Sequence, residues 1–314
     1  MLETAIAYEQ LEIELTAALA RTEPDEYVRR NMEFTLIEDF DHLYRYANLL
    51  KMLEKEEAEK LTGSDTEITV GRPTVTQHRH PVDTVRRSFD TRFVAPLTIL
   101  HVLTMTAIEQ QTRIFYMNQG PSVKGMLGRN LFQEIGRVEE QHVSQYETLM
   151  DPNESLFQRL VAHEYNECWL YYSLIEQETD DRLRDIWRDH LAMEVEHLQV
   201  AAGLMRRYER RDPERLFQSQ MPPALTFEPN MEYIRGVLAE QVSLTSVEDE
   251  FTPIKALPEN HRYFDYQGIV NREGAPSQTV MIEIMRRQGG DYRFEPAGQH
   301  PIESFRRREL AVTR

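Results

Sequence analysis

Two pairs of residues in this sequence have the spacing of metal ligands. Glu139 and His142 lie three residues apart, and so do Glu194 and His197. Residues three apart share one face of an α-helix, so each pair can present a carboxylate and an imidazole to one cation. The chain is rich in acids, however, and about one or two such pairs among its 10 histidines are expected by chance. The spacing therefore needs independent support.

An internal repeat supplies that support. Glu109 lies thirty residues before Glu139, and Glu164 lies thirty residues before Glu194. A glutamate followed by Glu-x-x-His therefore occurs twice, with an offset of 55 residues. Chance does not readily give the same pattern twice at one spacing, so the repeat favours a shared chemical role for the two copies.

A third copy of the pattern precedes the other two and is less regular. Asp39 and His42 form an Asp-x-x-His motif, and Glu9 lies thirty residues before Asp39. Aspartate replaces glutamate here, and other acids on the same predicted helix could solvate the histidine. The sequence therefore contains three candidate half-sites, each with one isolated acid and one acid-x-x-His pair.

Glu109 is the most informative of these acids. It is the only acid between Arg92 and Gln133, and its neighbours on a helix are largely apolar. An ionised carboxylate buried without a partner costs several kcal/mol, so it must be protonated, paired with a basic residue or bound to a metal. Glu164 and Glu194 have similarly apolar neighbours. Two divalent ions balance the charge of four such carboxylates, and two neutral imidazoles complete the ligand set.

These motifs resemble the ferritin-like superfamily of di-iron and di-manganese carboxylate proteins. In that superfamily, two helices each supply a Glu and two others each supply Glu-x-x-His to a site inside a four-helix bundle. The resemblance covers residues 1–210. It implies two iron ions, or manganese or a mixed Mn/Fe pair, and the following ligands: Glu109 and Glu164 as single ligands, Glu139 and Glu194 as bridging carboxylates, and His142 and His197 as terminal ligands.

Chain topology favours a different ligand set. Ferritin-like bundles join their two hairpins by a long crossover, and the long connection here, residues 61–91, separates the second and third predicted helices. The candidates of the second hairpin would then pair with Glu9, Asp39 and His42. We favour the second and third hairpins, because all four of their acids are glutamates. Further alternative ligands lie in the third hairpin: Glu167 and His190.

Hydrophobic periodicity near 3.6 residues places these motifs on about six helices in three hairpins, which predicts an all-α, ferritin-like helical bundle. The predicted helices cover about residues 2–20, 25–60, 92–118, 131–150, 155–177 and 180–211, and Asn130 is the expected N-cap of the fourth. We assign residues 1–212 to the bundle. The proline-rich residues 213–314 are expected to form an irregular arm or small appendage, with one short helix over 231–241.

Composition excludes several classes of protein. A single cysteine, Cys168, cannot form an intrachain disulfide, a Cys-based zinc site or a rubredoxin-type iron centre, and it fits a reducing cytosol. A net charge of -17 argues against nucleic acids and anionic membranes as partners. We recognise no secretion signal and no membrane-spanning segment, so we expect a cytoplasmic protein.

The expected function is that of an oxidoreductase: a di-iron oxidase, oxygenase or peroxidase that reacts with O2 or peroxide. Such an enzyme would take electrons from an external donor, could act on a small-molecule substrate and could form a homo-oligomer. The alternative is an iron-binding protein with a ferroxidase or storage role. A second alternative is a metal-free helical scaffold in which the spacing of acids and histidines is coincidental.

Overall fold

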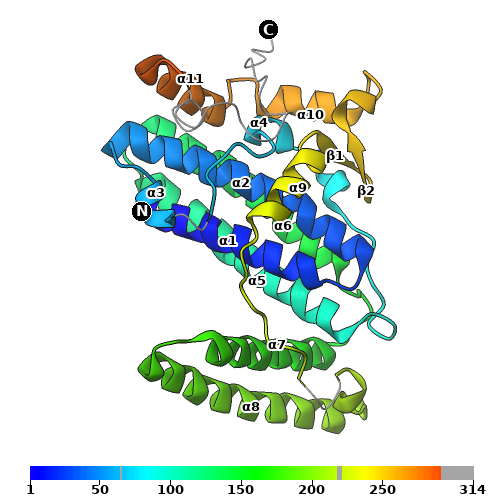
Figure 1. The fold of residues 1–314 in the computed structure, drawn as a ribbon. Coiled ribbons are helices and arrows are strands. Elements are labelled where there is room, and N and C mark those ends of the chain that lie inside the picture. The colour runs from blue at the N-terminus through cyan, green and yellow to red at the C-terminus, as the bar shows by residue number, and fades with distance from the viewer. Residues whose placement is uncertain (64–65, 218–220, 291–314) are drawn as a thin grey trace.

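The protein has an all-α fold, as the sequence predicts. The computed structural model describes residues 1–63, 66–217 and 221–290. Four long helices form an antiparallel bundle (Figure 1). These helices are α1 (Leu2–Thr22), α2 (Glu26–Glu54), α5 (Pro96–Gln119) and α6 (Met126–Leu149), and the short 3-10 turn η2 (Gly120–Ser122) joins the last two.

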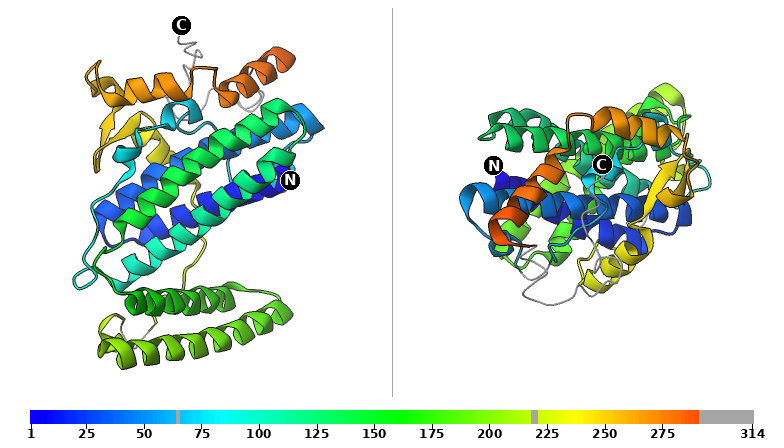
Figure 2. Two further views of the ribbon diagram at one scale, coloured as in Figure 1. Left: turned by 180° about the vertical axis from the view of Figure 1, so that it is seen from behind. Right: turned by 90° about the horizontal axis from the view of Figure 1, so that it is seen from above.

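The order of contacts along the helices defines the topology of the bundle. Helices α1 and α2 form one hairpin, and α5 and α6 form a second. Thr16 on α1 contacts Met105 on α5, and Glu9 contacts Tyr116, so these two helices are antiparallel. Helix α5 therefore begins at the end of the bundle where α2 begins. The chain between α2 and α5 consequently crosses the whole length of the bundle, as the two views of Figure 2 show.

This crossover contains three short helical turns and is attached to α2 by a glycine contact. The turns are α3 (Glu59–Thr62), α4 (Thr74–Gln77) and η1 (Pro81–Thr84). A Cβ atom on Gly71 would lie 2.0 Å from the carbonyl oxygen of Ile37. The next residue, Arg72, donates its backbone N–H to that oxygen at 2.9 Å. Only a residue without a side chain allows the crossover to approach α2 so closely.

The third predicted hairpin forms, but it lies across one end of the bundle. It consists of α7 (Leu156–Gln177) and α8 (Asp181–Glu209). Ser155 caps α7 with a capping box, and the Asp180 side chain caps α8. Helix α7 packs against α5, where Thr104 donates a hydrogen bond to Asn166 at 3.1 Å. Helix α8 packs on α7 and is the element farthest from the bundle (Figures 1 and 2).

Much of the segment after residue 212 packs on the bundle. Ile234 on α9 and Ile284 on α11 belong to the same apolar core as α1, α2 and α6. The described elements here are η3 (Pro213–Arg215), α9 (Met231–Gln241), β1 (Leu244–Val247), β2 (Glu250–Pro253), η4 (Ile254–Ala256), α10 (Arg262–Val270) and α11 (Pro276–Gln288). The strands form one antiparallel pair in which Leu244 faces Pro253. Residues 291–314 of the predicted appendage lie outside the described residues.

Three helix boundaries differ by four residues or more from the sequence prediction, and one of them is the start of α5, at Pro96 and not near residue 92. Helix α2 ends at Glu54, because Lys55 adopts a left-handed conformation with φ of 61°. Helix α6 begins at Met126, after Gly125 at φ of 82°, so Asn130 lies inside the helix and does not cap it. Gly125 adopts a positive φ that glycine tolerates, and α6 begins directly after it. The predicted N-cap, Asn130, lies five residues later in the sequence.

The interior of the bundle is apolar toward both ends and acidic in the middle. Tyr46, Tyr116 and Phe132 belong to one buried apolar cluster, and Met32 and Met105 belong to the other. The predicted ligands of α2 lie between Met32 and Tyr46 along the helix. None of the helices in the described ranges is both long and apolar enough to cross a lipid bilayer.

Candidate metal centre

All four bundle helices contribute side chains to one acidic site in the middle of the bundle. Every one of these side chains is fully buried, with 0% exposure. We call this group the bundle cluster, and its members are Glu9 on α1, Asp39 and His42 on α2, Glu109 on α5, and Glu139 and His142 on α6. This is the ligand set that chain topology favoured in the sequence.

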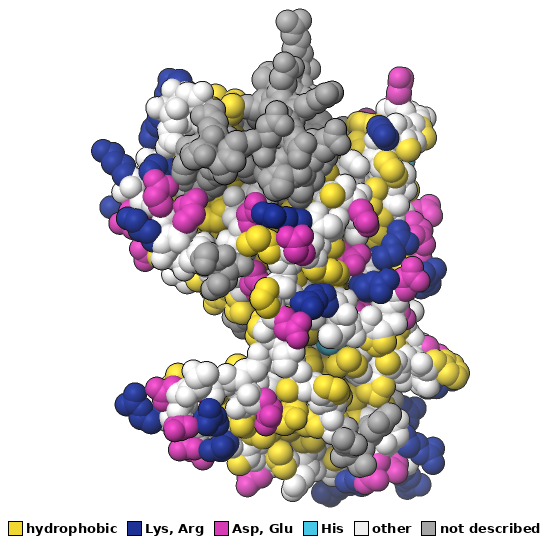
Figure 3. Space-filling model, in the orientation of Figure 1, with side chains coloured by type: hydrophobic (Ala, Val, Ile, Leu, Met, Phe, Trp, Pro, Cys, Tyr) yellow, Lys and Arg dark blue, Asp and Glu magenta, His cyan; other side chains and the backbone are white. Residues whose placement is uncertain are grey.

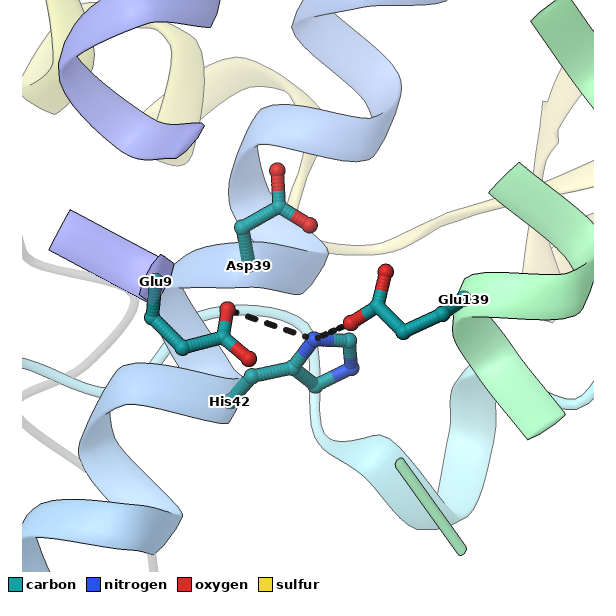
Figure 4. Close-up of side chains that lie close together, drawn as sticks. All are labelled: Glu9, Asp39, His42 and Glu139. Carbon is teal, nitrogen blue, oxygen red and sulfur yellow. Dashed lines mark ion pairs between the residues drawn. The ribbon is translucent and has the colours of Figure 1, made fainter. Parts of the chain in front are cut away.

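One half of the bundle cluster surrounds His42. The ligand atoms of Glu9, Asp39, His42 and Glu139 all lie within 4.8 Å of one another. His42 Nδ1 lies 2.8 Å from Glu139 Oε1 and 3.6 Å from Glu9 Oε2. Figure 4 shows the imidazole between these two carboxylates, with Asp39 one turn earlier on the same helix. The four side chains therefore converge on a space that suits a single cation.

The other half of the bundle cluster surrounds His142. Its Nδ1 atom lies 3.1 Å from Glu109 Oε2, 3.2 Å from Glu139 Oε2 and 3.4 Å from Asp39 Oδ1. The two imidazole rings are 5.9 Å apart between centroids. Asp39 and Glu139 belong to both halves, and the two oxygens of Glu139 face one histidine each. These two acids could therefore contact an ion held in either half.

The carboxylates of the bundle cluster lack the partners that buried charges require. Six of their oxygens have no hydrogen-bond partner among the described residues: Glu9 Oε2, both oxygens of Asp39, Glu109 Oε1 and both oxygens of Glu139. Arg113, the basic residue nearest to Glu109 in sequence, instead pairs with Glu140 at 3.0 Å. Four buried acids and two imidazoles match the charge and ligand number of two divalent ions. The residues present therefore fit a dinuclear metal centre.

Gln77 of the crossover and Glu38 on α2 hold the outer edges of the two histidines. His42 Nε2 lies 3.2 Å from Gln77 Oε1, and His142 Nε2 lies 2.7 Å from Glu38 Oε2. When Nε2 carries the proton and donates it to these oxygens, Nδ1 presents a lone pair to the cluster. Partners of this kind fix the ring orientation and raise the basicity of a histidine ligand.

Glu38 differs from the acids of the bundle cluster because arginines neutralise it. Arg72 Nη1 lies 2.6 Å from Glu38 Oε1, and Arg79 Nη1 lies 3.2 Å from Glu38 Oε2. Burial opposes ionisation of Glu38, but the two guanidinium groups and His142 hold its pKa well below its usual range. Glu38 therefore stays ionised and supports His142, a role that the sequence prediction missed.

Without a cation, protons must compensate the charge of the bundle cluster. Burial raises the pKa of Glu9 to about 7 and that of Glu109 to about 8, and it also raises the pKa of Asp39. Burial disfavours charged histidine, yet the nearby carboxylates raise the pKa of His42 and His142 well above its usual value. The metal-free cluster is thus loaded with protons that a divalent ion would displace.

Glu12 is a further buried acid that the sequence prediction missed. It lies one turn after Glu9 on α1, is fully buried and accepts a hydrogen bond from the Thr112 hydroxyl. Burial and the nearby acids, Glu139 and Glu109 foremost, raise its pKa well above the usual range. Glu9-x-x-Glu12 has the same three-residue spacing as the other motifs, so this signal was present in the sequence.

The structure separates the third hairpin from the bundle cluster. Glu164, Glu194 and His197 form their own group, the hairpin cluster, whose ligand atoms lie within 4.8 Å of one another. The favoured pairing of the second and third hairpins is therefore not the one found. The crossover places α1 and α2 against the interior faces of α5 and α6, and α7 packs on the outside of α5. Glu167 and His190 also lie on this hairpin. The His190 ring stacks on the Tyr171 ring, with 5.1 Å between the ring centroids.

The bundle cluster has the chemistry of a site for iron(II) or manganese(II). Carboxylate-rich ligand sets with a few imidazoles suit these ions better than zinc or copper, which favour sulfur or nitrogen. Fold and side-chain geometry are the grounds for this assignment, because a comparison with protein-family models, curated proteins and solved structures finds no match for this chain.

Proposed function

We propose that this protein is a ferritin-like, non-haem dinuclear metal oxidoreductase that reacts with O2 or peroxide. One observation carries the proposal: two fully buried groups of ligand atoms share Asp39 and Glu139, and six of their carboxylate oxygens have no hydrogen-bond partner among the described residues. Two iron ions are the proposed cofactor, with manganese or a mixed Mn/Fe pair as the alternative.

The geometry gives each ligand a role. His42 and His142 would bind through Nδ1, because Gln77 and Glu38 hold their Nε2 atoms. Asp39 and Glu139 would bridge the ions, which leaves Glu9 and Glu109 as ligands on opposite sides. When bound, such a pair of ions supplies a binding site for O2 or peroxide and the electrons for its reduction.

Burial favours small reactants. All members of the bundle cluster have 0% exposure. Gln77 of the crossover contacts His42, and Arg72 of the crossover contacts Glu38, the partner of His142. O2 and peroxide are small enough to reach a site of this kind through thermal fluctuations, whereas a larger organic substrate would require the crossover to move. This favours an oxidase or peroxidase that takes electrons from an external donor.

Metal analysis of matched variants tests the proposal. The full-length protein is loaded with Fe(II) without oxygen, and bound iron is counted before the sample is exposed to O2 or peroxide. We expect Glu139→Gln to lose two ions per chain and the associated consumption of oxidant. Glu140→Gln, at an exposed neighbouring position, should keep both. Full iron binding in folded Glu139→Gln would refute the proposal, and many irons per chain in a large assembly would indicate storage instead.

A further inference from the structure

The α7–α8 hairpin carries half of a dinuclear ligand set. Each hairpin of the bundle contributes one acid from its first helix and an acid-x-x-His pair from its second helix. The hairpin cluster has the same composition, with Glu164 on α7 and Glu194-x-x-His197 on α8. His197 Nδ1 lies 2.9 Å from Glu194 Oε2 and 3.9 Å from Glu164 Oε2. The His197 side chain is 59% exposed, so the group faces solvent on the side where a second half would lie.

Helix α8 presents an exposed apolar seam around this group. Seven positions follow one another with alternating spacings of three and four residues, the pattern of a helix that packs on partner helices. We call these positions the α8 seam: Leu183, Ile186, His190, Met193, His197, Val200 and Leu204. Ile186 is 45% exposed, Met193 47% and Val200 63%. Only a partner outside the described chain would bury such a seam.

Helix α7 carries a second seam of the same kind. Its positions also alternate by three and four residues, and they form the α7 seam: Leu156, Leu160, His163, Glu167, Leu170, Leu174 and Gln177. Leu156 is 76% exposed and Leu174 is 41% exposed. Both seams carry apolar residues on either side of acids or histidines, and the α7 seam ends at the polar Gln177, which contacts Leu225 and Phe227 of the same chain. A hairpin with two such seams is half of a four-helix bundle.

The exposed apolar residues of α8 are concentrated on this seam. Apart from Val195 and Tyr208, the large apolar side chains exposed on α8 all belong to the seam. The adjacent exposed face of α8 carries Asp185, Asp189 and Glu196, as expected for a face in water. In the space-filling view, hydrophobic side chains are exposed over the α7–α8 hairpin on the face turned to the viewer (Figure 3).

We infer that a second copy of this chain covers this hairpin face about a two-fold axis, completing a four-helix bundle and a second dinuclear metal site. Glu164, Glu194 and His197 of each copy would supply its ligands. A two-fold interface places the same surface on both partners, so a half-set of ligands meets an identical half-set. The two copies together provide four acids and two histidines, the numbers found in the bundle cluster.

The position of the hairpin cluster fits such an axis. Glu164 is the ninth of the 22 residues of α7, and Glu194 is the fourteenth of the 29 residues of α8. Both therefore lie near the middle of their helices. An axis through the centre of the hairpin would bring the two half-sets together while the two antiparallel hairpins overlap along their full length.

Charge makes this association depend on a divalent cation. Two carboxylates and one imidazole per copy balance one divalent ion, and the pair of copies would hold two. Without the ions, the interface brings four acids together, which disfavours the dimer. Because the ions bind the dimer in preference to the separate chains, they shift the equilibrium toward the dimer by mass action. The expected ligand is Fe(II) or Mn(II), as at the bundle cluster.

Metal counting and sedimentation of the full-length chain test this inference, with Mn(II) as the probe. We expect a wild-type dimer with three Mn(II) per chain: two in the bundle cluster and one as the share of the interface site. Glu194→Ala should lose one ion per chain, whereas Glu139→Gln should lose two and remain a dimer. Glu196→Ala, on the polar face of α8, should retain all three. The two sites are thus tested separately, because each variant removes a different number of ions.

A second variant pair tests the interface without touching a ligand. Met193→Asp places a charge on the α8 seam and should give a monomer with two Mn(II) per chain and unchanged helix content. Ala192→Asp, on the adjacent exposed position outside the seam, should remain a dimer with three. A wild-type chain that stays monomeric with Mn(II), a dimer that persists in Met193→Asp, or full metal content in Glu194→Ala would overturn the inference.

Discussion

Replacing Glu109 by glutamine should stabilise the metal-free protein as the pH rises. Burial raises the Glu109 pKa from 4.5 to about 8, so the folded protein holds this proton while the unfolded chain releases it above pH 4.5. Below pH 4.5 the carboxyl is protonated in both states, so it does not lower the free energy of unfolding. As the pH rises from 4.5 to about 8, the free energy of unfolding falls, because only the unfolded chain releases the proton. Glutamine has a similar shape and no charge, and its carbonyl can still accept a hydrogen bond from His142 Nδ1, which lies 3.1 Å from Glu109 Oε2.

The size of the effect follows from the pKa shift. At about 1.4 kcal/mol per pKa unit, the raised pKa of Glu109 lowers the free energy of unfolding by about 1 kcal/mol at pH 5 and by roughly 5 kcal/mol at pH 9. Glu109→Gln avoids this cost. Its advantage in free energy of unfolding should therefore grow by on the order of 4 kcal/mol between these two pH values.

Urea unfolding of both proteins with a chelator present, at pH 5 and pH 9, measures this difference. Glu140→Gln, at an exposed position on α6, is the matched control and should show no such pH dependence. Adding Mn(II) should reverse the order at pH 8, because the ions stabilise the wild type and not Glu109→Gln. An advantage that is the same at pH 5 and pH 9 would refute the idea that Glu109 is a buried, uncompensated acid.

Three further outcomes follow from the structure. Binding of Mn(II) at pH 7 should release protons, and the affinity for Mn(II) should rise from pH 6 to pH 8, because the pKa of Glu9 is raised to about 7 and that of Glu109 to about 8. Calorimetry in buffers of different ionisation enthalpy measures the proton release. A binding heat that does not depend on the buffer would contradict the prediction. Arg79→Met should cost about 3 kcal/mol of unfolding free energy, because Glu38 loses one of its two buried guanidinium partners; a urea midpoint close to wild type would argue against that role. Gly71→Ala should destabilise the protein by about 1 to 3 kcal/mol, because the added Cβ atom clashes with α2. Gly203→Ala is the matched control: its Cβ atom meets no other atom within 4 Å, so it should stabilise α8 by about 0.5 to 1 kcal/mol. Thermal unfolding compares the two variants, and equal shifts in Tm would count against the clash.

The sequence contained all six side chains that converge in the bundle, but motif quality favoured a hairpin that lies apart from them. The predictions for Glu109, Glu139 and His142 rested on their spacing and on the lack of other acids near Glu109. Their spacing did not show which other hairpin packs beside them, because that depends on how the chain crosses the bundle. A connection as long as residues 61–91 can cross the bundle and place α1 and α2 beside α5 and α6, whereas the short turn before α7 directs the third hairpin elsewhere. The length of the connection was a physical constraint, while the preference for glutamate over aspartate concerned only ligand type.

The supports of the bundle cluster were not predictable from spacing. Glu38 and Asp39 are adjacent in sequence, yet Asp39 points into the bundle and Glu38 contacts Arg72 and Arg79. Neighbouring residues on a helix point about 100° apart, so only knowledge of what covers each face separates a ligand from its support. The crossover supplies that cover in a stretch without regular periodicity. Its arginines therefore gave no signal in the sequence that tied them to the cluster.

An odd number of candidate half-sites accounts for the sequence preference for the third hairpin and for our proposal that a second copy covers it. Each of the three hairpins carries an isolated acid and an acid-x-x-His pair, so any two of them would make a plausible dinuclear site. The fold joins the first with the second, and the third is left with two acids, one histidine and two exposed seams. A single chain cannot pair three half-sites. Two chains carry six, which pair completely when the third hairpins of both copies meet.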